Sequence, residues 1–404
     1  MPILGSQSSG AKSAPTVPTV GTATVTNSTT VSLTFTAPSS KLPITSYTAT
    51  SSPSISLSTS GTTSPVTITG TFASGTAYTF TLAAVNANGT STASSASNSV
   101  TPYVLPKNGY VMGGYSSSVI RSTVIKINFS NDTISSLGAI MPAARRYGHA
   151  GFANSGTAGY SAGGINSASS ILTTILKLTF TGDSVSTIGS TLSVIATMTG
   201  SALANSGTAG YVSIGTDGGS PRRTVDKITF SNDSRSTLAA ELSEYGNERT
   251  GFANSGTAGY FAGGNSTGVN INKILFSNDA VSSLGASLAG FRSGSMSAAN
   301  SGTAGYIAGR AGNNESRIDK LTFSNDSTST ISATISRGRG YGVGFANSGT
   351  AGYFVAGYST SDSGSSSIDK IAFSNDTRSV LSETLPSGMN ELQQTAGFAN
   401  SGVL

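Results

Sequence analysis

The chain offers few side chains that could catalyse a reaction or bind a metal. It contains one histidine, His149, and no cysteine, which excludes sites built from several histidines or from thiolates. His149 stands in a Gly-His pair ahead of an apolar stretch, and this position indicates a structural role. We therefore predict no catalytic residue, no cofactor, no metal site and no enzymatic activity.

Aspartate recurs in a short turn of the form Ser/Thr-x-Asp. One carboxylate at a fixed place in each copy is typical of a repeated hairpin turn, whereas a glycosidase needs two carboxylates that flank one bond. Calcium needs about six or more oxygen ligands, and each turn supplies one carboxylate. Four of the turns also match the N-glycosylation pattern, for which turn chemistry is the simpler interpretation. The aspartates are Asp132, Asp183, Asp233, Asp279, Asp326 and Asp376, and the asparagines are Asn131, Asn232, Asn325 and Asn375.

Arginine and tyrosine are the side chains left for recognition. Arginine binds carboxylate and phosphate groups bidentately, and both residue types are enriched at the centres of binding surfaces. The candidate ligand-binding residues are Arg145, Arg146, Tyr147, Arg222, Arg223, Tyr245, Arg249, Arg292, Arg310, Arg337, Arg339 and Tyr341. We expect that replacing Arg145, Arg146, Arg337 and Arg339 by Ser abolishes binding and leaves thermal melting unchanged.

The elements that position these residues come from an internal repeat. The line GFANSGTAGY at residues 151–160 returns with changes, and the tyrosines of its copies are spaced 46 to 51 residues apart. Each copy predicts four short strands, here called a to d: GFAN, AGYFAGG, a run such as VDKITF and a run such as RSTLAAEL. In VDKITF, Ile228 and Phe230 alternate with Lys227 and Thr229, which is strand periodicity. Six copies predict an all-β fold with a six-bladed β-propeller over residues 104–404.

The incomplete last copy predicts how the propeller closes. The first b strand, at Tyr110, has no a strand before it, and the chain ends on a lone a strand at residues 396–401. We expect this terminal strand to pair with the first b strand, because that pairing removes an exposed sheet edge.

The copies differ at one end of the predicted blades and agree at the other. In a meandering blade the a–b and c–d turns lie at one end, and the b–c and d–a connections lie at the opposite end. The first pair reads NSGT and SND in nearly every copy, while the second pair differs in all of them and holds most of the arginines. Loops on a rigid scaffold often carry binding sites, so we interpret the variable end as the binding surface. The alternative is that surface loops drift without a function.

The copy around residue 150 resembles a kelch repeat. The segment ARRYGHAGFANSGTAGYSAGG contains the kelch order of Arg145, Gly148-His149, an apolar stretch and the diglycine Gly163-Gly164. The tryptophan that is usual in the last kelch strand is absent, and Leu or Ile stands in its place. The resemblance implies a divergent, kelch-like propeller.

Residues 15–103 resemble a fibronectin type III domain. The segment GTAYTFTLAAVNANGTSTAS is similar to the F strand of that domain and the turn after it, which implies that Tyr78 is the corner tyrosine whose hydroxyl bonds to the backbone. The usual B-strand tryptophan is missing, so Leu33 and Phe35 are expected to fill the core. Another immunoglobulin-like sandwich is the alternative.

Charge and hydropathy exclude several classes of partner. Charged residues make up 10% of the chain, the net charge is +5, and no run of Lys or Arg occurs, so nucleic-acid binding has little support. No apolar stretch approaches the roughly 20 residues that span a bilayer, and the N-terminus lacks the pattern of a secretory signal. We predict no nucleic-acid partner and no membrane insertion.

A fibronectin-like domain joined to a Ser/Thr/Gly/Ala-rich propeller resembles the tail-fibre and virion structural proteins of tailed bacteriophages. The resemblance implies a place at the particle surface, where an N-terminal arm (residues 1–14) and the fibronectin-like domain contact other virion proteins and the propeller binds a host surface glycan or lipopolysaccharide. A homo-oligomer is compatible with it. One alternative is a structural decoration of the capsid or tail without a receptor. Another is a glycan-degrading enzyme with acidic residues drawn from Glu244, Glu248, Asp217, Glu315 and Asp362.

Overall fold

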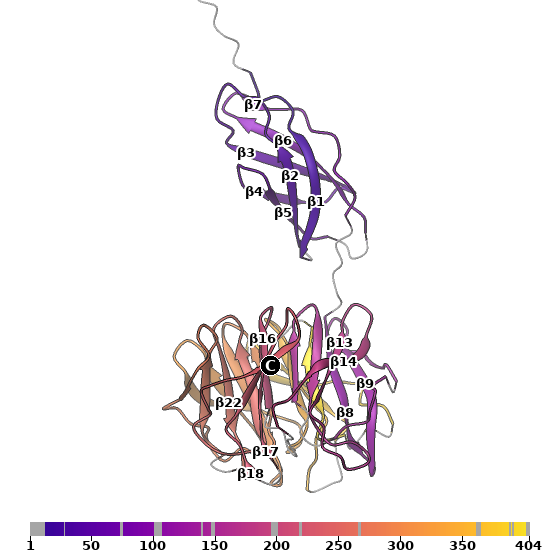
Figure 1. Cartoon of the computed structure of the whole chain (residues 1–404), viewed down its shortest axis with the longest axis vertical. Helices are drawn as coiled ribbons and strands as arrows, with labels where there is room; N and C mark the ends of the chain where they lie inside the picture. The colour runs from indigo at the N-terminus through magenta and orange to yellow at the C-terminus, as the bar shows by residue number, and fades with distance from the viewer. Residues whose placement is uncertain are drawn as a thin grey trace, which may run out of the picture. The chain divides into compact units, whose positions relative to one another are not determined.

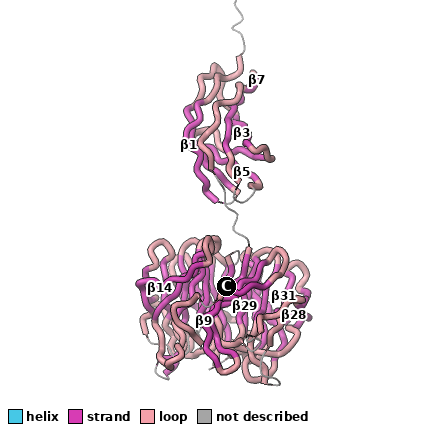
Figure 2. The backbone as a smooth tube through the Cα atoms, turned by 90° about the vertical axis from the view of Figure 1, so that its right-hand side faces the viewer, coloured by secondary structure: helices cyan, strands magenta, loops and turns pink. Residues whose placement is uncertain are grey.

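The computed structural model contains β-strands and no helix in the residues that it describes, so none there could cross a membrane as a helix (Figures 1 and 2). Those residues are 13–27, 29–72, 76–100, 107–138, 140–146, 150–194, 201–217, 220–265, 268–360, 365–387, 389 and 392–400. The chain divides into two compact units, residues 1–105 and 106–404, and each is described by itself. The N-terminal arm lies almost entirely outside the described residues.

Unit 1 is a sandwich of two antiparallel sheets. The first has the order β1 (Thr19–Asn27), β2 (Thr30–Thr36), β5 (Val66–Gly70), β4 (Leu57–Ser60), and the second has the order β3 (Ser46–Ser52), β6 (Thr79–Asn86), β7 (Gly89–Thr90). Every second residue of β6 is buried, so alternation of the side chains places one face of the strand in the core. Leu33, Phe35 and Tyr78 are buried in that core, which confirms that the first two fill it.

Serine at every third position lets the segment after β7 follow β6. Ser91, Ser94 and Ser97 each donate a backbone N–H to a carbonyl of β6 and accept an N–H of β6 on the side-chain oxygen, with N···O distances of 2.8 to 3.0 Å. A period of three suits an extended polyproline-like backbone. The serine side chains thus satisfy the backbone N–H groups on that side of β6.

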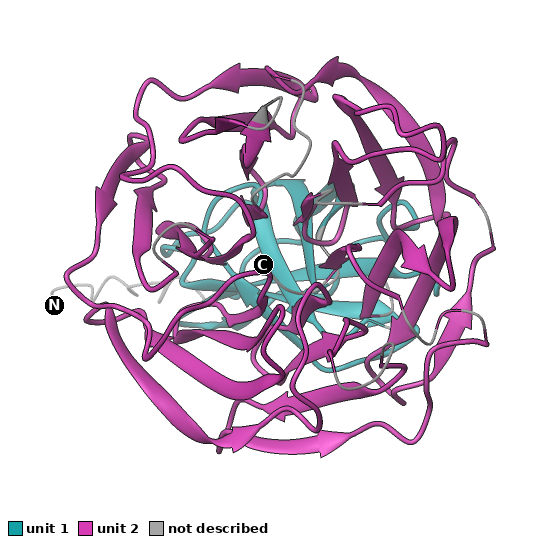
Figure 3. Ribbon diagram, turned by 90° about the horizontal axis from the view of Figure 1, so that it is seen from below, with its two compact units in different colours: residues 1–105 teal, residues 106–404 magenta. Residues whose placement is uncertain are grey.

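Unit 2 consists of six four-stranded antiparallel sheets arranged around a ring, as in a β-propeller (Figure 3). We call these sheets blades 1 to 6. Their strands, from the first sheet member to the last, are β33 (Ala396–Ala399), β8 (Asn108–Ser116), β9 (Val119–Asn128) and β10 (Ile134–Ser136); β11 (Ala150–Asn154), β12 (Ala158–Ala162), β13 (Thr174–Thr179) and β14 (Ser184–Thr191); β15 (Ser201–Asn205), β16 (Ala209–Ser213), β19 (Val225–Thr229) and β20 (Ser234–Thr237); β21 (Arg249–Asn254), β22 (Ala258–Gly263), β23 (Ile271–Leu275) and β24 (Ala280–Ser283); β25 (Met296–Asn300), β26 (Ala304–Arg310), β27 (Glu315–Thr322) and β28 (Ser327–Thr334); and β29 (Val343–Asn347), β30 (Ala351–Val355), β31 (Ile368–Ala372) and β32 (Thr377–Val380).

The last strand of the chain completes the first blade. β33 pairs antiparallel with β8, with Phe398 opposite Tyr110 and Ala396 opposite Met112. The prediction that the terminal a strand pairs with the first b strand is therefore confirmed. Blade 3 adds a feature that the repeat did not predict, because β17 (Thr216–Asp217) and β18 (Ser220–Pro221) form a separate two-stranded sheet between β16 and β19.

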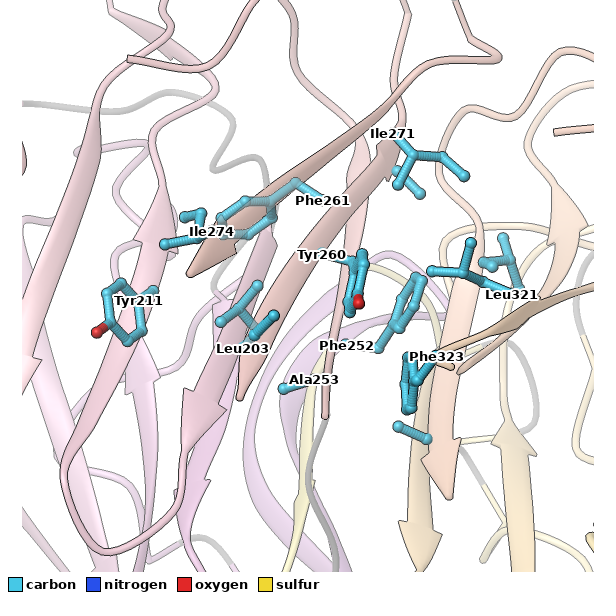
Figure 4. Packing of buried hydrophobic residues seen from close by; sticks show 14 of the residues in the cluster. Leu203, Tyr211, Phe252, Ala253, Tyr260, Phe261, Ile271, Ile274, Leu321 and Phe323 are labelled. Atoms are coloured by element: carbon cyan, nitrogen blue, oxygen red, sulfur yellow. The ribbon is translucent and has the colours of Figure 1, made fainter. Parts of the chain in front are cut away.

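Neighbouring blades pack an apolar a-strand side chain against the glycine of the AGY line. A Cβ atom placed on Gly210 would lie 2.1 Å from Phe152 Cδ2, so only glycine leaves room for the ring of the preceding blade. The same contact repeats between Phe252 and Gly305, and Figure 4 shows the ring of Phe252 beside those of Tyr260 and Phe323. The ring of Tyr260 stacks on Phe323 with centroids 5.3 Å apart. The recurring Phe and Gly are therefore two halves of one contact between blades.

The six turn aspartates hold each blade to the one before it. Each carboxylate accepts a hydrogen bond from a tyrosine hydroxyl of the preceding blade at 2.7 to 2.8 Å and pairs with a lysine of the same blade at 2.6 to 2.7 Å. The aspartates adopt left-handed backbone angles, with φ of 49° to 58°. The sixth tie runs from Tyr353 and Lys370 in blade 6 back to Asp132 in blade 1. The ties thus join blade 6 to blade 1 as they join every other neighbouring pair.

The NSGT turns form a second set of contacts between blades. Gly207 donates its N–H to the side-chain oxygen of Asn154 at 2.9 Å, and Gly256 donates to Asn205 at 2.8 Å. The same bond recurs from Gly302 and from Gly349 to the asparagine of the preceding blade. The nearly constant turns of the sequence are therefore structural contacts.

Candidate functional site

The variable connections meet at one rim of unit 2, here called the variable rim. Backbone bridges join b–c connections to d–a connections at Tyr115–Gln393, Arg146–Ile165 and Gly340–Tyr358. The two sets of loops therefore lie side by side, as a meandering blade requires. Their side chains form the candidate site.

The structure corrects the role of Arg292 and Arg339, which are 1% and 0% exposed. Arg292 contacts the carboxylate of Asp319 at 3.0 Å, and Arg339 contacts that of Asp369 at 2.8 Å. Both aspartates lie in c strands and are themselves buried. Burial lowers the pKa of both arginines, and the neighbouring aspartates oppose that shift. These guanidinium groups bind the interior of their own blades and are not available to a ligand.

Arg145 and Arg249 are corrected for the same reason. Arg145 donates to the carbonyls of Gly163 and Thr174 at 3.0 and 2.9 Å. Arg249 donates to the carbonyls of Gly246 and Glu244. Burial lowers the pKa of each arginine to about 10. The predicted four-arginine replacement would therefore also destabilise the fold, since Arg145 and Arg339 support their blades from inside.

Three arginines of the variable rim lie against aromatic rings. The guanidinium carbon of Arg146 is 5.0 Å from the ring centroid of Tyr115, that of Arg223 is 5.0 Å from the centroid of Tyr245, and that of Arg310 is 4.5 Å from the centroid of Phe291. Each pair joins a b–c connection to a d–a connection. Stacking of this kind holds the guanidinium plane in place. Tyr115 and Phe291 were missed in the sequence, because nothing there shows which ring meets which arginine.

The remaining candidates are placed as follows. Arg222 is half-buried, and its backbone N–H donates to the carbonyl of Gly215 at 2.7 Å. Arg337 is exposed. Tyr147 lies outside the described residues, as does His149.

Tyr341 and Glu248 meet across two blades of the variable rim. The Tyr341 hydroxyl donates to one carboxylate oxygen of Glu248 at 2.8 Å, and the Ser293 hydroxyl donates to the other. Both Glu248 and Tyr341 have left-handed backbone angles, with φ of 58° and 57°. Their backbones are linked through Gly294, which donates to Glu248 and accepts from Tyr341. The carboxylate thus fastens three d–a connections to one another.

The other acidic residues of the enzyme alternative do not converge on Glu248 through any contact in the structure. The Glu244 carboxylate accepts a hydrogen bond from Asn270, and that of Glu315 pairs with Arg317 at 3.5 Å. Asp362 and the side chain of Asp217 lie outside what the structure describes. Within the described part of the chain, no three His, Cys, Asp or Glu side chains group closely enough to hold a metal ion.

Comparison with known proteins identifies a likeness of fold alone. No family model and no curated protein matches the sequence. Among solved structures, the chain is similar to the protein described as "Structure of YjhT", with a TM-score of 0.51 and 13% sequence identity over 67% of this chain and 96% of that one. At this identity the likeness supports the arrangement of strands and carries no activity with it.

Proposed function

We propose that the chain is a fibre-type protein of a bacteriophage particle and that the variable rim of unit 2 binds a glycan or lipopolysaccharide on the host surface. The observation that carries the proposal is the set of three stacked Arg–aromatic pairs, all of which lie on the variable rim. Tyr and Arg held in a fixed geometry are the side chains that dominate binding surfaces.

The folds of both units support the domain order behind this proposal. The strand order of unit 1, with β1-β2-β5-β4 in one sheet and β3-β6-β7 in the other, is that of an immunoglobulin-like sandwich. This agrees with a fibronectin type III-like domain and equally with a related sandwich. The six blades of unit 2 and the buried arginines near the starts of blades 2, 4, 5 and 6 agree with a kelch-like propeller.

Sequence variation at one rim is not by itself evidence for binding. The opposite rim is held constant by the hydrogen bonds of the NSGT turns and by the Tyr–Asp–Lys ties. The loops of the variable rim lack these repeated duties and could therefore change freely. What supports binding is the kind of residue they acquired, since drift does not favour aromatic rings paired with arginine.

Unit 1 and the N-terminal arm have the role of attachment in this proposal. They would contact other virion proteins, while unit 2 is presented outward on the particle surface. The purely structural alternative predicts that the variable rim binds no host component. The two can therefore be separated by one measurement on the isolated chain.

That measurement is the binding of the labelled full-length chain to an array of bacterial surface polysaccharides and to host cells. A variant with Arg146, Arg223 and Arg310 replaced by Ser should lose binding, because each loses a stacked guanidinium that is at least partly exposed. The matched control replaces Thr157, Thr208 and Thr257 by Ser, at exposed positions of the constant rim. Undiminished binding by the arginine variant, or no binding by the unaltered chain to any surface, would overturn the proposal.

A further inference from the structure

One backbone hydrogen bond recurs in every blade and aligns the variable rim residue by residue. In each blade, the N–H of a buried apolar residue after strand d donates to the carbonyl of a residue just before or at the start of strand c. The six pairs are Met141–Ser122, Leu192–Thr173, Leu242–Arg223, Leu288–Val269, Ile335–Ser316 and Leu385–Ser366, with N···O distances of 2.8 to 3.2 Å. Equivalent positions can therefore be compared between blades from geometry.

Blade 3 departs from the other five at two of these positions. Where blade 3 has Arg223, the other blades have Ser, Thr or Val, as the pairs above show. The residue before the buried apolar one is Glu241 in blade 3 and is Ile140, Thr191, Ser287, Thr334 or Thr384 in the others. The residue three places after it is Tyr245 in blade 3. Oppositely charged side chains thus occur together in one blade, next to an aromatic ring.

These three side chains form one surface. The guanidinium carbon of Arg223 lies 5.0 Å from the Tyr245 ring centroid, and its Nη2 atom pairs with a carboxylate oxygen of Glu241. Tyr245 is 59% exposed. The side chains of Arg223 and Glu241 are 34% and 48% exposed. An aromatic ring, a planar donor and a planar acceptor therefore face solvent side by side.

The backbone beneath this surface is fixed on both sides. Leu242 donates to Arg223 at 2.9 Å, Arg222 donates to Gly215 at 2.7 Å, and Ile214 donates to Thr224 at 2.9 Å. The separate β17–β18 sheet, which no other blade shows in its described residues, lies directly before Arg222 in the chain. A surface held this way keeps its geometry when a ligand binds, which limits the entropy that binding costs.

The chemistry of the three groups selects a class of ligand. The C–H face of a sugar ring can stack on an exposed aromatic ring, which is apolar on its face. Two adjacent hydroxyl groups can accept from the guanidinium and donate to the carboxylate at the same time. Because Glu241 already balances the charge of Arg223, an anionic ligand gains little there and is repelled by the carboxylate. An exposed ion pair is also weak in water, so its two members can turn to a ligand.

We propose, on the basis of the proposed glycan-binding function, that Arg223, Glu241 and Tyr245 form a subsite for a neutral sugar with adjacent hydroxyl groups. The subsite belongs to blade 3 alone. It recognises uncharged hexose units of a surface polysaccharide in preference to phosphorylated or uronic-acid units.

The test measures affinities of the full-length chain for neutral manno-, galacto- and gluco-oligosaccharides and for oligogalacturonate, by titration calorimetry at low and high salt. The chain should bind one or more neutral probes with little dependence on salt. Tyr245→Ala should weaken that binding about tenfold or more, and Glu241→Gln should weaken it while improving binding of oligogalacturonate. The control Tyr115→Ala, in the ring of another Arg–aromatic pair, should leave the affinity for the neutral probe unchanged.

The subsite is overturned if the chain binds only the acidic probe, or if Tyr245→Ala and Glu241→Gln both bind the neutral probe as the unaltered chain does. Either result would leave the proposed function standing if the arginine variant of the variable rim still fails to bind host polysaccharide. Absence of binding to every probe and every host surface would overturn both. Unchanged melting of each variant shows that a loss of affinity is not a loss of folding.

Discussion

Replacing Phe398 by Ala tests the pairing that joins the end of the chain to its first propeller strand. Phe398 lies in β33, is fully buried and sits over Gly159 of blade 2, where an added Cβ atom would be 1.9 Å from its ring. Its ring also stacks on Tyr110, with centroids 5.8 Å apart, and lies 6.2 Å from that of Phe180. The side chain thus holds blade 1 to blade 2 at the point of closure.

The expected cost follows from these contacts. Truncation of a fully buried phenylalanine costs about 3–5 kcal/mol, and the cost is higher where neighbouring atoms cannot fill the cavity. A glycine without a side chain lies directly beneath the ring, so little can move into the space. We therefore expect a loss of about 4 kcal/mol in the free energy of unfolding of unit 2.

Phe252→Ala is the matched control, because Phe252 makes the same contact with Gly305 inside the continuous part of the ring. Calorimetry of the full-length variants separates the transition of unit 2 from that of unit 1. The two variants should lower the stability of unit 2 by similar amounts. A cost below about 1 kcal/mol for Phe398→Ala, beside a full cost for Phe252→Ala, would refute the pairing of β33 with β8 in solution.

Three further predictions concern the contacts within and between blades. Gly210→Ala should destabilise unit 2 by about 1–3 kcal/mol, because its Cβ atom would overlap the Phe152 ring; normal stability in urea unfolding would contradict the packing. Arg339→Ser should cost about 3–5 kcal/mol, because it leaves the Asp369 carboxylate buried without its cation, whereas Arg337→Ser, at an exposed position, should cost less than about 0.5 kcal/mol. Equal costs for these two in urea unfolding would contradict their placement. Stability should also fall as the pH rises above about 10, the tyrosine pKa in the unfolded chain, because burial first and the partner aspartate second raise the pKa of the folded hydroxyls. Ultraviolet titration of tyrosine ionisation against pH checks this; titration of all tyrosines at the ordinary pKa in the folded protein would contradict it. The tyrosines concerned are Tyr160, Tyr211, Tyr260, Tyr306 and Tyr353.

The arrangement of strands could be predicted from the sequence because it is written repeatedly. Six copies of one line and a terminal fragment imply the pairing of β33 with β8, which the structure contains. The role of the turn aspartates was only half visible. A repeated turn was correctly expected, but Tyr160 and Lys177 lie in a different copy from their partner Asp233. The recurrence of Tyr, Lys and Asp once in every copy was the signal that could have revealed these ties.

The candidate site was harder to predict because loop sequence does not show which way a side chain turns. Arg337 and Arg339 are two residues apart, yet one is exposed and the other binds a buried aspartate thirty residues later in the chain. Glu241 was not a candidate, because its position beside Arg223 depends on the register between the segment after strand d and strand c. That register is set by the hydrogen bond from Leu242 to Arg223.

Amide hydrogen exchange with and without a bound oligosaccharide tests most directly whether the variable rim is the binding surface. The proposed function predicts slower exchange on binding in residues 220–224 and 238–249, and unchanged exchange in the constant turns at residues 154–157 and 205–208. Protection of those constant turns, or of unit 1 alone, by a sugar that the chain demonstrably binds would contradict it.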